Sequence, residues 1–430
     1  MSVNPVSVLN VTECQQILDN SFQSTPVTYV SHTARSLSGD VEGYLSEHYS
    51  LEITYSEDGQ SDTTHTKKFF VKCLLSHNGF MAEFTRAMDV FNREAFLYTH
   101  LFRQFEKLNV YKQIAPEFCL AKENMLVLED LSVKGYKAAH RMNNFTMEQC
   151  KVALETIAYF HAYSIIHEEL KSKETGTKYR LNIVFPDEFE EKFYSGIEDS
   201  PTTKFIASSI QCLLDIIDEL PEDRVNKDEL KRLLKEDKAG ESDLEQDTER
   251  YRFTCVHGDL WANNIMFKHN ETGHLEGCQL VDFQMIRYCL PAFDVELFFY
   301  GNTTAEFRRQ HKEELLHYYY NRLGEALEKN GLNIKELLPF AELQDTSKLK
   351  APEAKIQAIS DTSLLYLPEE ILQQGMTMPD FFKTLLIDER SKYILNLYHE
   401  NEEFRNLIIE ELVDLQELLE AKKTFIYTAS

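Results

Sequence analysis

Two acids and an amide that could carry out chemistry lie close together in the second half of the chain. Asp259 and Asn264 belong to the run H-G-D-L-W-A-N-N, and Asp282 belongs to V-D-F-Q a short way downstream. Phosphoryl transfer needs a carboxylate that orients an acceptor hydroxyl, and oxygen ligands for the magnesium ion that bridges the phosphates. Either acid alone is more typical of an ordinary turn beside a buried strand. Together the three residues favour phosphoryl transfer, because the combined pattern is far more specific than any one member.

The spacing assigns a role to each of the three residues. The separation of Asp259 and Asn264 equals that in the protein-kinase pattern H-R-D-x-x-x-x-N, and Asp282 lies where that fold places its D-F-G aspartate after a hairpin. Glu271-Thr272-Gly273 is suited to the turn of this hairpin. We therefore predict that Asp259 orients the acceptor hydroxyl and takes its proton, and that Asn264 and Asp282 hold Mg²⁺.

The two runs together, H-G-D-x-W-x-x-N and V-D-F-Q, resemble the choline and aminoglycoside kinase group, and most closely the ecdysteroid kinase-like (CHK kinase-like) family. This resemblance implies ATP-dependent phosphorylation of a small-molecule alcohol, with ecdysteroids as the named substrate class. Gln284 stands where protein kinases have the glycine of D-F-G, which points away from protein kinases. The likeness covers most of the chain, and its other supports are Phe70-Val71-Lys72, Phe91 to Tyr98, Leu126 to Leu131, Gly135-Tyr136 and Phe160-His161-Ala162.

Lys72 and Glu94 are the candidates for holding the nucleotide phosphates. Lys72 ends an apolar strand, so its stem is expected to be buried and its ammonium to reach the phosphates of ATP. Glu94 falls on the next predicted helix and would fix the lysine through an ion pair, as in protein kinases. The alternative is a surface lysine and a solvated glutamate.

Four further residues are predicted to bind the nucleotide. Glu129 and Leu131 lie in the expected linker, where backbone N–H and C=O groups can recognise the adenine edge, although Glu129 could instead belong to an acidic helix cap. Met266 could lie beneath the adenine, but a methionine in such a run is more often part of the core. Ser46 ends the loop 38–46, which has two glycines but no G-x-G-x-x-G pattern, so phosphate binding and a simple turn are equally compatible with it.

Nearby polar residues are expected to be structural rather than catalytic. His257 and His161 are predicted to brace the backbone, and Asp294 to brace the catalytic loop from the start of a helix. There is no zinc-ligand pattern, no G-x-S-x-G nucleophile elbow and no cysteine nucleophile signature. Hydrolase functions therefore have little support.

The elements that must position these residues predict an α+β protein. Apolar runs indicate strands over 44–55 and 67–75 that pair as an antiparallel hairpin, and an amphipathic helix over 91–105 straight after it. The segment 219–250 is crowded with charges and predicts a surface helix and an exposed loop without a chemical role. The remaining predictions are strands over 125–128, 253–256, 265–268 and 279–281, and helices from the cap residue Thr146 to Tyr163, over 305–330 and over 401–423.

These elements predict the bilobal protein-kinase-like fold. A small N-terminal lobe, residues 1–130, would carry an antiparallel sheet and bind the nucleotide phosphates. A large, mainly helical lobe, residues 131–430, would hold the catalytic loop, the magnesium site and the acceptor pocket, with ATP between the lobes. The aromatic runs 298–300 and 318–320 could line a steroid-sized pocket, but at helical spacing they are more typical of a core.

Composition argues against several partners. The 430-residue chain has a formal charge of −26 and no basic stripe, which disfavours nucleic acid and anionic lipid surfaces. Its eight cysteines include no C-x-x-C pair and are expected to be reduced. The lack of a signal-peptide pattern and of a long apolar stretch predicts a cytoplasmic protein without membrane insertion, and a monomer is favoured.

A catalytically silent pseudokinase that binds a nucleotide or a lipophilic ligand is the alternative function. Intact motifs do not prove turnover. Against this alternative, Lys72, Asp259, Asn264 and Asp282 are all present, whereas a silent member would be free to lose one of them.

Overall fold

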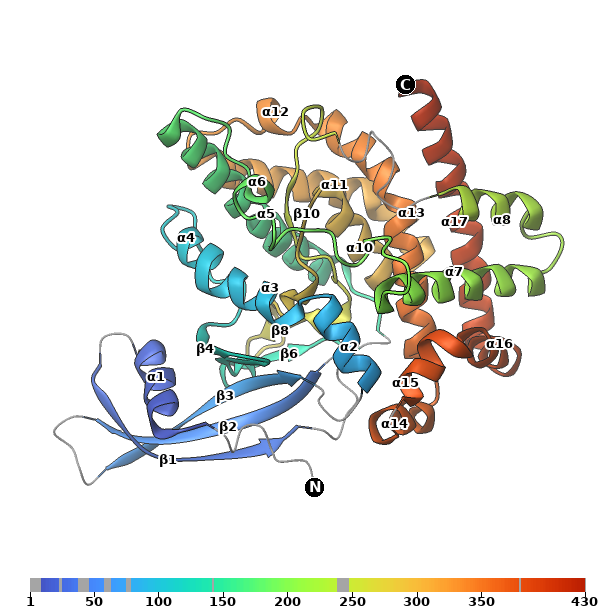
Figure 1. Cartoon of the computed structure of the whole chain (residues 1–430). Helices are drawn as coiled ribbons and strands as arrows, with labels where there is room; N and C mark the ends of the chain where they lie inside the picture. Colours follow the sequence, from blue (N-terminus) through green and yellow to red (C-terminus); the bar gives the residue numbers. More distant parts are fainter. Residues whose placement is uncertain are drawn as a thin grey trace.

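The N-terminal part of the chain is built on a five-stranded antiparallel sheet (Figure 1). The computed structural model describes residues 9–22, 25–37, 46–57, 63–74, 79–140, 143–237, 247–378 and 380–429. The predicted hairpin is confirmed, and Lys72 lies opposite His48 and Leu126 on the two neighbouring strands. In their order across the sheet, the strands are β1 (Val27–Ser36), β2 (Ser46–Glu57), β3 (Thr64–Leu74), β5 (Met125–Glu129) and β4 (Phe118–Lys122).

One face of this sheet is apolar and the other carries Lys72. Leu51, Phe69 and Val71 are buried in a common cluster with α1 (Val11–Phe22), a helix that was not predicted. Because successive side chains of a strand point to opposite faces, Lys72 points away from Val71 and α1. The alternation of β3 therefore directs the lysine toward the helices that follow the hairpin.

Two helical parts follow the hairpin: α2 (Gly79–Ala87), and then a continuous run that begins with α3 (Val90–Phe96). α3 continues into a π-helical stretch (Leu97–Phe102) and α4 (Arg103–Phe105), which confirms the helix predicted over this region. The prediction that it follows the hairpin directly is wrong, because α2 lies between them. The break falls at Asp89, whose φ of 56° is left-handed and interrupts the helical path.

The long helix α5 (Met147–Thr175) begins as predicted. The hydroxyl of Thr146 accepts a hydrogen bond from the backbone N–H of Gln149, and the Gln149 side chain returns a bond in a capping box. The helix is longer than predicted because its buried residues continue beyond Tyr163, and it ends before Gly176 in the left-handed conformation.

Two small sheets carry the loops with the predicted catalytic residues. The strands predicted over 253–256, 265–268 and 279–281 are confirmed. The hairpin turn predicted at Gly273 is also present, where this glycine has a φ of 85°. The first sheet pairs β7 (Thr254–Val256) with β10 (Arg287–Cys289), and the second places β8 (Ile265–His269) between β6 (Tyr136–Ala138) and β9 (Leu275–Leu280).

Helices form the rest of the C-terminal part, and Figure 1 shows α7 and α8 beside α16 and α17. The charged segment predicted to be a surface helix is α8, but Leu230, Leu233 and Leu234 on it are buried, so it also contributes to the core. The main helices are α7 (Pro201–Glu219), α8 (Lys227–Glu236), α10 (Ala292–Asn302), α11 (Ala305–Glu328), α13 (Phe340–Leu365), α14 (Glu369–Thr377), α16 (Arg390–Glu400) and α17 (Glu402–Ala429), with short helices at Leu181–Val184, Ile334–Leu337, Phe381–Lys383 and Thr384–Asp388.

This arrangement, an antiparallel sheet with its helix followed by a helical lobe, is the predicted bilobal protein-kinase-like fold. The predicted boundary after residue 130 falls between β5 and a 3₁₀ turn (Leu131–Lys134). All eight cysteines are buried free thiols, as expected. Every helix in the described ranges is too short or too polar to cross a lipid bilayer.

Candidate active site

Lys72 connects the sheet to its predicted partner on α3 and to the segment that follows β9. Its ammonium donates to Glu94 Oε2 at 2.8 Å, to Asp282 Oδ1, and to Gln284 Oε1 at 3.3 Å. The side chains of Lys72 and Glu94 are only 3% and 1% exposed. The alternative of a surface lysine and a solvated glutamate is therefore wrong.

The positive charge of Lys72 and the negative charges of Glu94 and Asp282 stabilise each other. Burial opposes the charge on Lys72, but the carboxylates of Asp282 and Glu94 outweigh it and raise the pKa of the lysine. Burial also raises the pKa of Glu94, and the charge of Lys72 limits that rise. Lys72 thus stays positively charged at neutral pH and acts as the common counterion of two carboxylates.

The H-G-D turn is held from beneath by Asp294 on α10. Asp294 Oδ2 accepts from the backbone N–H of His257 at 2.7 Å, and Oδ1 accepts from that of Gly258 at 2.9 Å. Oδ2 also lies 3.0 Å from His161 Nε2. Burial alone would raise the pKa of Asp294, but the hydrogen bond and charge of His161 and the other bonds lower it. Asp294 braces the backbone of this turn, as expected from its position in the sequence, whereas the His161 side chain hydrogen-bonds Asp294 and Tyr319 and acts through that carboxylate.

Glycine is required at position 258 for two reasons. Its φ of 81° is left-handed, and a Cβ atom there would collide with the carbonyl oxygen of Met285. His257 closes the other side of the turn, with Nε2 3.0 Å from Val281 O and Nδ1 accepting from the Asp259 N–H at 3.3 Å. The turn is thereby joined to the strand that leads to Asp282.

Asn264 holds the predicted catalytic carboxylate in place. Its Nδ2 donates to the backbone oxygen of Asp259 at 2.8 Å and to Asp259 Oδ2 at 2.9 Å. In the part of the chain that the structure describes, nothing donates to Asp259 Oδ1. Burial, followed by the charges of Asp361 and Asp282, raises the pKa of Asp259. One oxygen of a basic carboxylate is thus available to an acceptor hydroxyl.

Asp282 lies in a strained backbone conformation after β9. Its φ of 65° and ψ of 62° are left-handed, a region that non-glycine residues rarely occupy. The next residue, Phe283, donates its N–H to Glu94 Oε1 at 3.1 Å, and its ring packs against Tyr98 and Phe102. These anchors hold the Asp282 carboxylate toward Lys72.

The donor atoms of Asn264 and Asp282 fit a magnesium ion. Asn264 Oδ1 and Asp282 Oδ2 have no hydrogen-bond donor among the described residues, and both are the hard oxygen ligands that Mg²⁺ prefers. No group of three or more His, Cys, Asp or Glu residues that could hold a metal occurs in these ranges. An ion here would therefore depend on nucleotide phosphates for further ligands, which is typical of magnesium in phosphotransferases.

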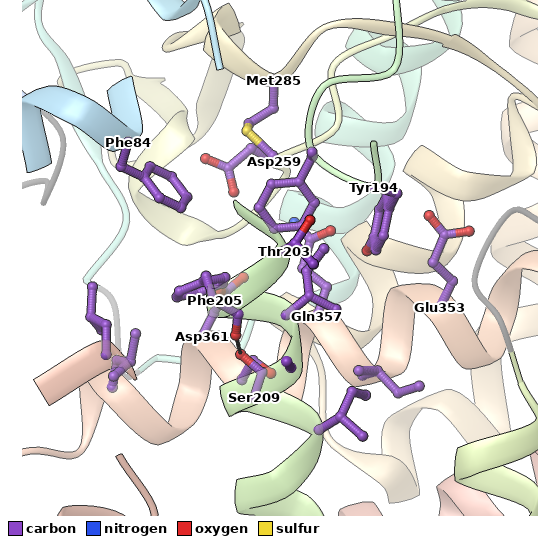
Figure 2. A pocket seen from close by; sticks show the side chains of 18 of the residues that line it. Phe84, Tyr194, Thr203, Phe205, Ser209, Asp259, Met285, Glu353, Gln357 and Asp361 are labelled. Carbon is purple, nitrogen blue, oxygen red and sulfur yellow. Dashed lines mark hydrogen bonds between the residues drawn. The ribbon is translucent and has the colours of Figure 1, made fainter. Parts of the chain in front are cut away.

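A cavity of 570 Å³ lies beside this cluster (Figure 2), with Ser46, Asp259 and Asp282 in its wall. Pockets of about 300–1,000 Å³ accommodate drug-sized ligands. Much of the wall comes from α2, α7 and α13, as well as from the loop before α7. Its large apolar residues are Met81, Phe84, Phe193, Phe205, Ile206, Ile210, Leu234, Trp261, Met285, Ile356, Leu364, Leu365 and Leu386.

Ser46, the predicted phosphate ligand, forms part of the wall of this cavity. This buried residue begins β2, and its hydroxyl lies 2.9 Å from His48 Nε2. Burial and the charge of Lys72 lower the pKa of His48 to about 4, so this imidazole is neutral at physiological pH. The rest of the predicted phosphate loop, residues 38–45, lies outside the described residues.

The predicted adenine residues lie apart from the cavity. The Glu129 side chain bonds Lys134 at 2.5 Å and Gln113 at 3.0 Å, and its backbone N–H donates to Glu117 O at 2.9 Å. The helix cap is Asp130, which accepts from Ser132. Leu131 is buried, and Met266 on β8 is half-buried between β6 and β9.

Sequence reasoning missed the residues that shape the cavity. Phe298, Phe299 and Tyr319 are fully buried in the core, as their helical spacing favoured, and the aromatic wall comes instead from residues scattered between 84 and 261. The segment 219–250, expected to have no chemical role, contributes Leu234 and Lys235 to the wall. The apolar face of the helix over 201–219 was the signal available in the sequence.

The fold, the Lys–Glu pair, the asparagine-held carboxylate and the second carboxylate after a hairpin are the features of a kinase-like phosphotransferase. The model of the ecdysteroid kinase-like family matches residues 40–332, and the chain belongs to this family.

Two solved structures are similar over nearly the whole chain at low identity. Choline kinase LicA from Streptococcus pneumoniae is 12% identical, with 89% of this chain and 99% of that chain covered and a TM-score of 0.35. A GDP complex of a mutant aminoglycoside 2'-phosphotransferase IIIa is 11% identical, with 91% and 100% covered and a TM-score of 0.34. A comparison with curated proteins found no match.

Proposed function

We propose that this protein is an ATP- and magnesium-dependent kinase that phosphorylates a hydroxyl group of a largely apolar small molecule. One observation carries the proposal: Asp259 keeps one oxygen on Asn264 while its carboxylate forms part of the wall of an apolar cavity. Ecdysteroids, the substrate class in the family's name, are the first acceptors to test.

The chemistry assigned to Asp259 follows from its surroundings. A hydroxyl group in the cavity would donate to the oxygen that Asn264 leaves unpaired, which aims the acceptor at the nucleotide. The acceptor oxygen bonds the γ-phosphorus as the bond to the ADP oxygen breaks, and Asp259 takes the hydroxyl proton. The raised pKa of Asp259 favours this proton transfer.

The other residues would serve the nucleotide. Asp282 and Asn264 would hold Mg²⁺, which spreads the charge of the phosphates during transfer. Lys72, fixed by Glu94, would bind the phosphates from the sheet side. Ser46 would donate to a phosphate, and the adenine would lie near the Glu129–Leu131 backbone and Met266.

The test is Asp259→Asn with a panel of apolar alcohols that includes ecdysteroids. We expect ADP release to fall by about 10²–10⁴-fold, the usual contribution of general base catalysis, while ATP affinity changes little. Near-normal turnover in the variant would contradict the role of Asp259. A wild-type protein that binds ATP and apolar ligands but releases no ADP with any acceptor would support the silent pseudokinase instead.

A further inference from the structure

A second carboxylate in the acceptor cavity lacks a partner. Asp361 lies on α13 and forms part of the same wall as Asp259 (Figure 2). Within the described ranges, its carboxylate has neither a hydrogen-bond donor nor an ion-pair partner. Glu353 on the same helix is different, because Arg287 at 2.7 Å and Lys350 at 2.8 Å neutralise it. Asp361 is thus a polar group without a partner in a mainly apolar space.

The charged groups that act on Asp361 do not satisfy it. Arg390 is a nearby cation, but it donates to the backbone oxygen of Ser360 at 3.3 Å and lies 4.9 Å above the Phe205 ring. Burial raises the pKa of Asp361 to about 7, and the charge of Arg390 only moderates this rise. Asp361 in turn raises the pKa of Asp259. The cavity therefore contains two carboxylates that repel each other.

Asp361 is held in a defined position relative to the catalytic turn. Gln357 lies four residues before it, and therefore on the same face of α13. The Gln357 Nε2 donates to the backbone oxygen of Gly258 at 3.1 Å, next to Asp259. This bond ties the helix that carries one carboxylate to the turn that carries the other, so a rigid ligand could contact both.

We propose that Asp361 binds a second hydrogen-bond donor of the acceptor, a hydroxyl or a protonated amine, while Asp259 receives the hydroxyl that is phosphorylated. The inference rests on the proposed function of the cavity and narrows its substrate class to apolar molecules with at least two donor groups. A simple monoalcohol leaves the half-buried Asp361 carboxyl group without a donor, whereas a second donor satisfies it. Asp361 is thereby a specificity-determining residue.

The test compares three probes built on the same rigid four-ring hydrocarbon. The monoalcohol has one hydroxyl, the diol has two, and the amino alcohol has one hydroxyl and one amine. Calorimetry without nucleotide measures their binding to the wild type, Asp361→Leu and Asp361→Asn. Leucine has the shape of aspartate without its polarity. We expect it to weaken diol binding by at least about 10-fold, and to strengthen monoalcohol binding because an unpaired charge is removed.

The asparagine variant distinguishes the two kinds of donor. Asp361→Asn should keep part of the affinity for the diol, because an amide oxygen still accepts a hydrogen bond. It should lose its affinity for the amino alcohol, because a neutral amide cannot balance the ammonium charge. Asp345→Asn, on the exposed end of the same helix, is the matched control and should leave all affinities unchanged. Melting curves confirm that each variant is folded.

Equal diol affinity in the wild type and Asp361→Leu, including no measurable binding by either, would overturn the inference. Equal losses for diol and monoalcohol would also overturn it, since they would indicate a damaged cavity. Measuring ADP release with ATP and the same three probes tests the proposed kinase activity separately from ligand binding. The expected binding pattern without ADP release would refute kinase activity and leave the role of Asp361 standing.

Discussion

Lys72 joins three segments of the chain at a single ammonium group. Its pairing with Glu94 follows from the order of strand and helix, and the structure brings these two side chains together. Its contacts with Asp282 and Gln284 join segments far apart in the chain. Asp361 had no comparable signal, because an acid on a long helix is ordinary until that helix is packed against the catalytic turn.

The Lys72–Glu94 pair makes a prediction about stability. Lys72→Met leaves Glu94 buried without its cation, and we expect unfolding to become easier by about 3–5 kcal/mol. Adding Glu94→Gln should recover part of this loss, because the unpaired charge is then gone. Urea unfolding of both single variants and the double variant measures the coupling. Strictly additive losses would show that the two side chains do not act as a pair.

The proposed magnesium-binding role of Asp282 can be tested by thermal melting with and without Mg²⁺. Asp282→Asn should lower the melting temperature of the unliganded protein, because Lys72 loses one partner. If the carboxylate also holds magnesium, the additional thermal shift that Mg²⁺ produces with ATP should shrink, while the shift with ATP alone changes less. An undiminished magnesium-dependent shift would rule out the metal role.

At the scale of elements, local chemistry predicts where structure begins better than where it continues. The capping box at Thr146 and the strand alternation around Lys72 could be predicted because their causes lie within a few residues. The length of α5 could not, since its later turns are buried by distant partners. The break at Asp89 also escaped prediction, because a left-handed aspartate has no strong sequence signature.

The H-G-D turn, residues 257–259, provides a prediction that can be checked against a second glycine of the same chain. Gly258→Ala and Gly273→Ala both force alanine into left-handed backbone, which costs roughly 1–2 kcal/mol. Only the first also places a Cβ against the Met285 carbonyl, while the second faces open space. We expect Gly258→Ala to be about 1–3 kcal/mol more destabilising in chemical denaturation. Equal losses would mean that the turn relaxes without strain.

At the scale of the whole molecule, buried ion pairs tie the C-terminal helix to the lobe. Arg308 on α11 reaches Glu411 at 3.2 Å and Asp414 at 2.8 Å on α17, and the fully buried Lys355 on α13 contacts the same two acids. Periodicity predicted α11 and α17 but not this network. Charged residues inside a helical pattern are normally assigned to solvent, and only the packing of three helices shows otherwise.

Removing one acid from this network should loosen α17. Glu411→Ala leaves two buried cations with Asp414 alone, and we expect a loss of about 3–5 kcal/mol in the free energy of unfolding. Glu410→Ala changes the neighbouring exposed glutamate and should have little effect. Comparable losses in the two variants would show that helix propensity, rather than the ion pairs, holds α17 in place.

The shared counterion of Asp282 and Glu94 has a consequence for the order in which ligands arrive. Free Mg²⁺ approaching Asp282 Oδ2 would meet a carboxylate whose charge is already balanced in part by the Lys72 ammonium on Oδ1. Phosphates offer Lys72 a new anionic partner, which lowers the barrier to releasing that carboxylate. Nucleotide and metal should therefore raise each other's affinity by the same factor, as linkage requires. If the proposed magnesium site is correct, calorimetry should detect weak Mg²⁺ binding without nucleotide and tighter binding with ATP.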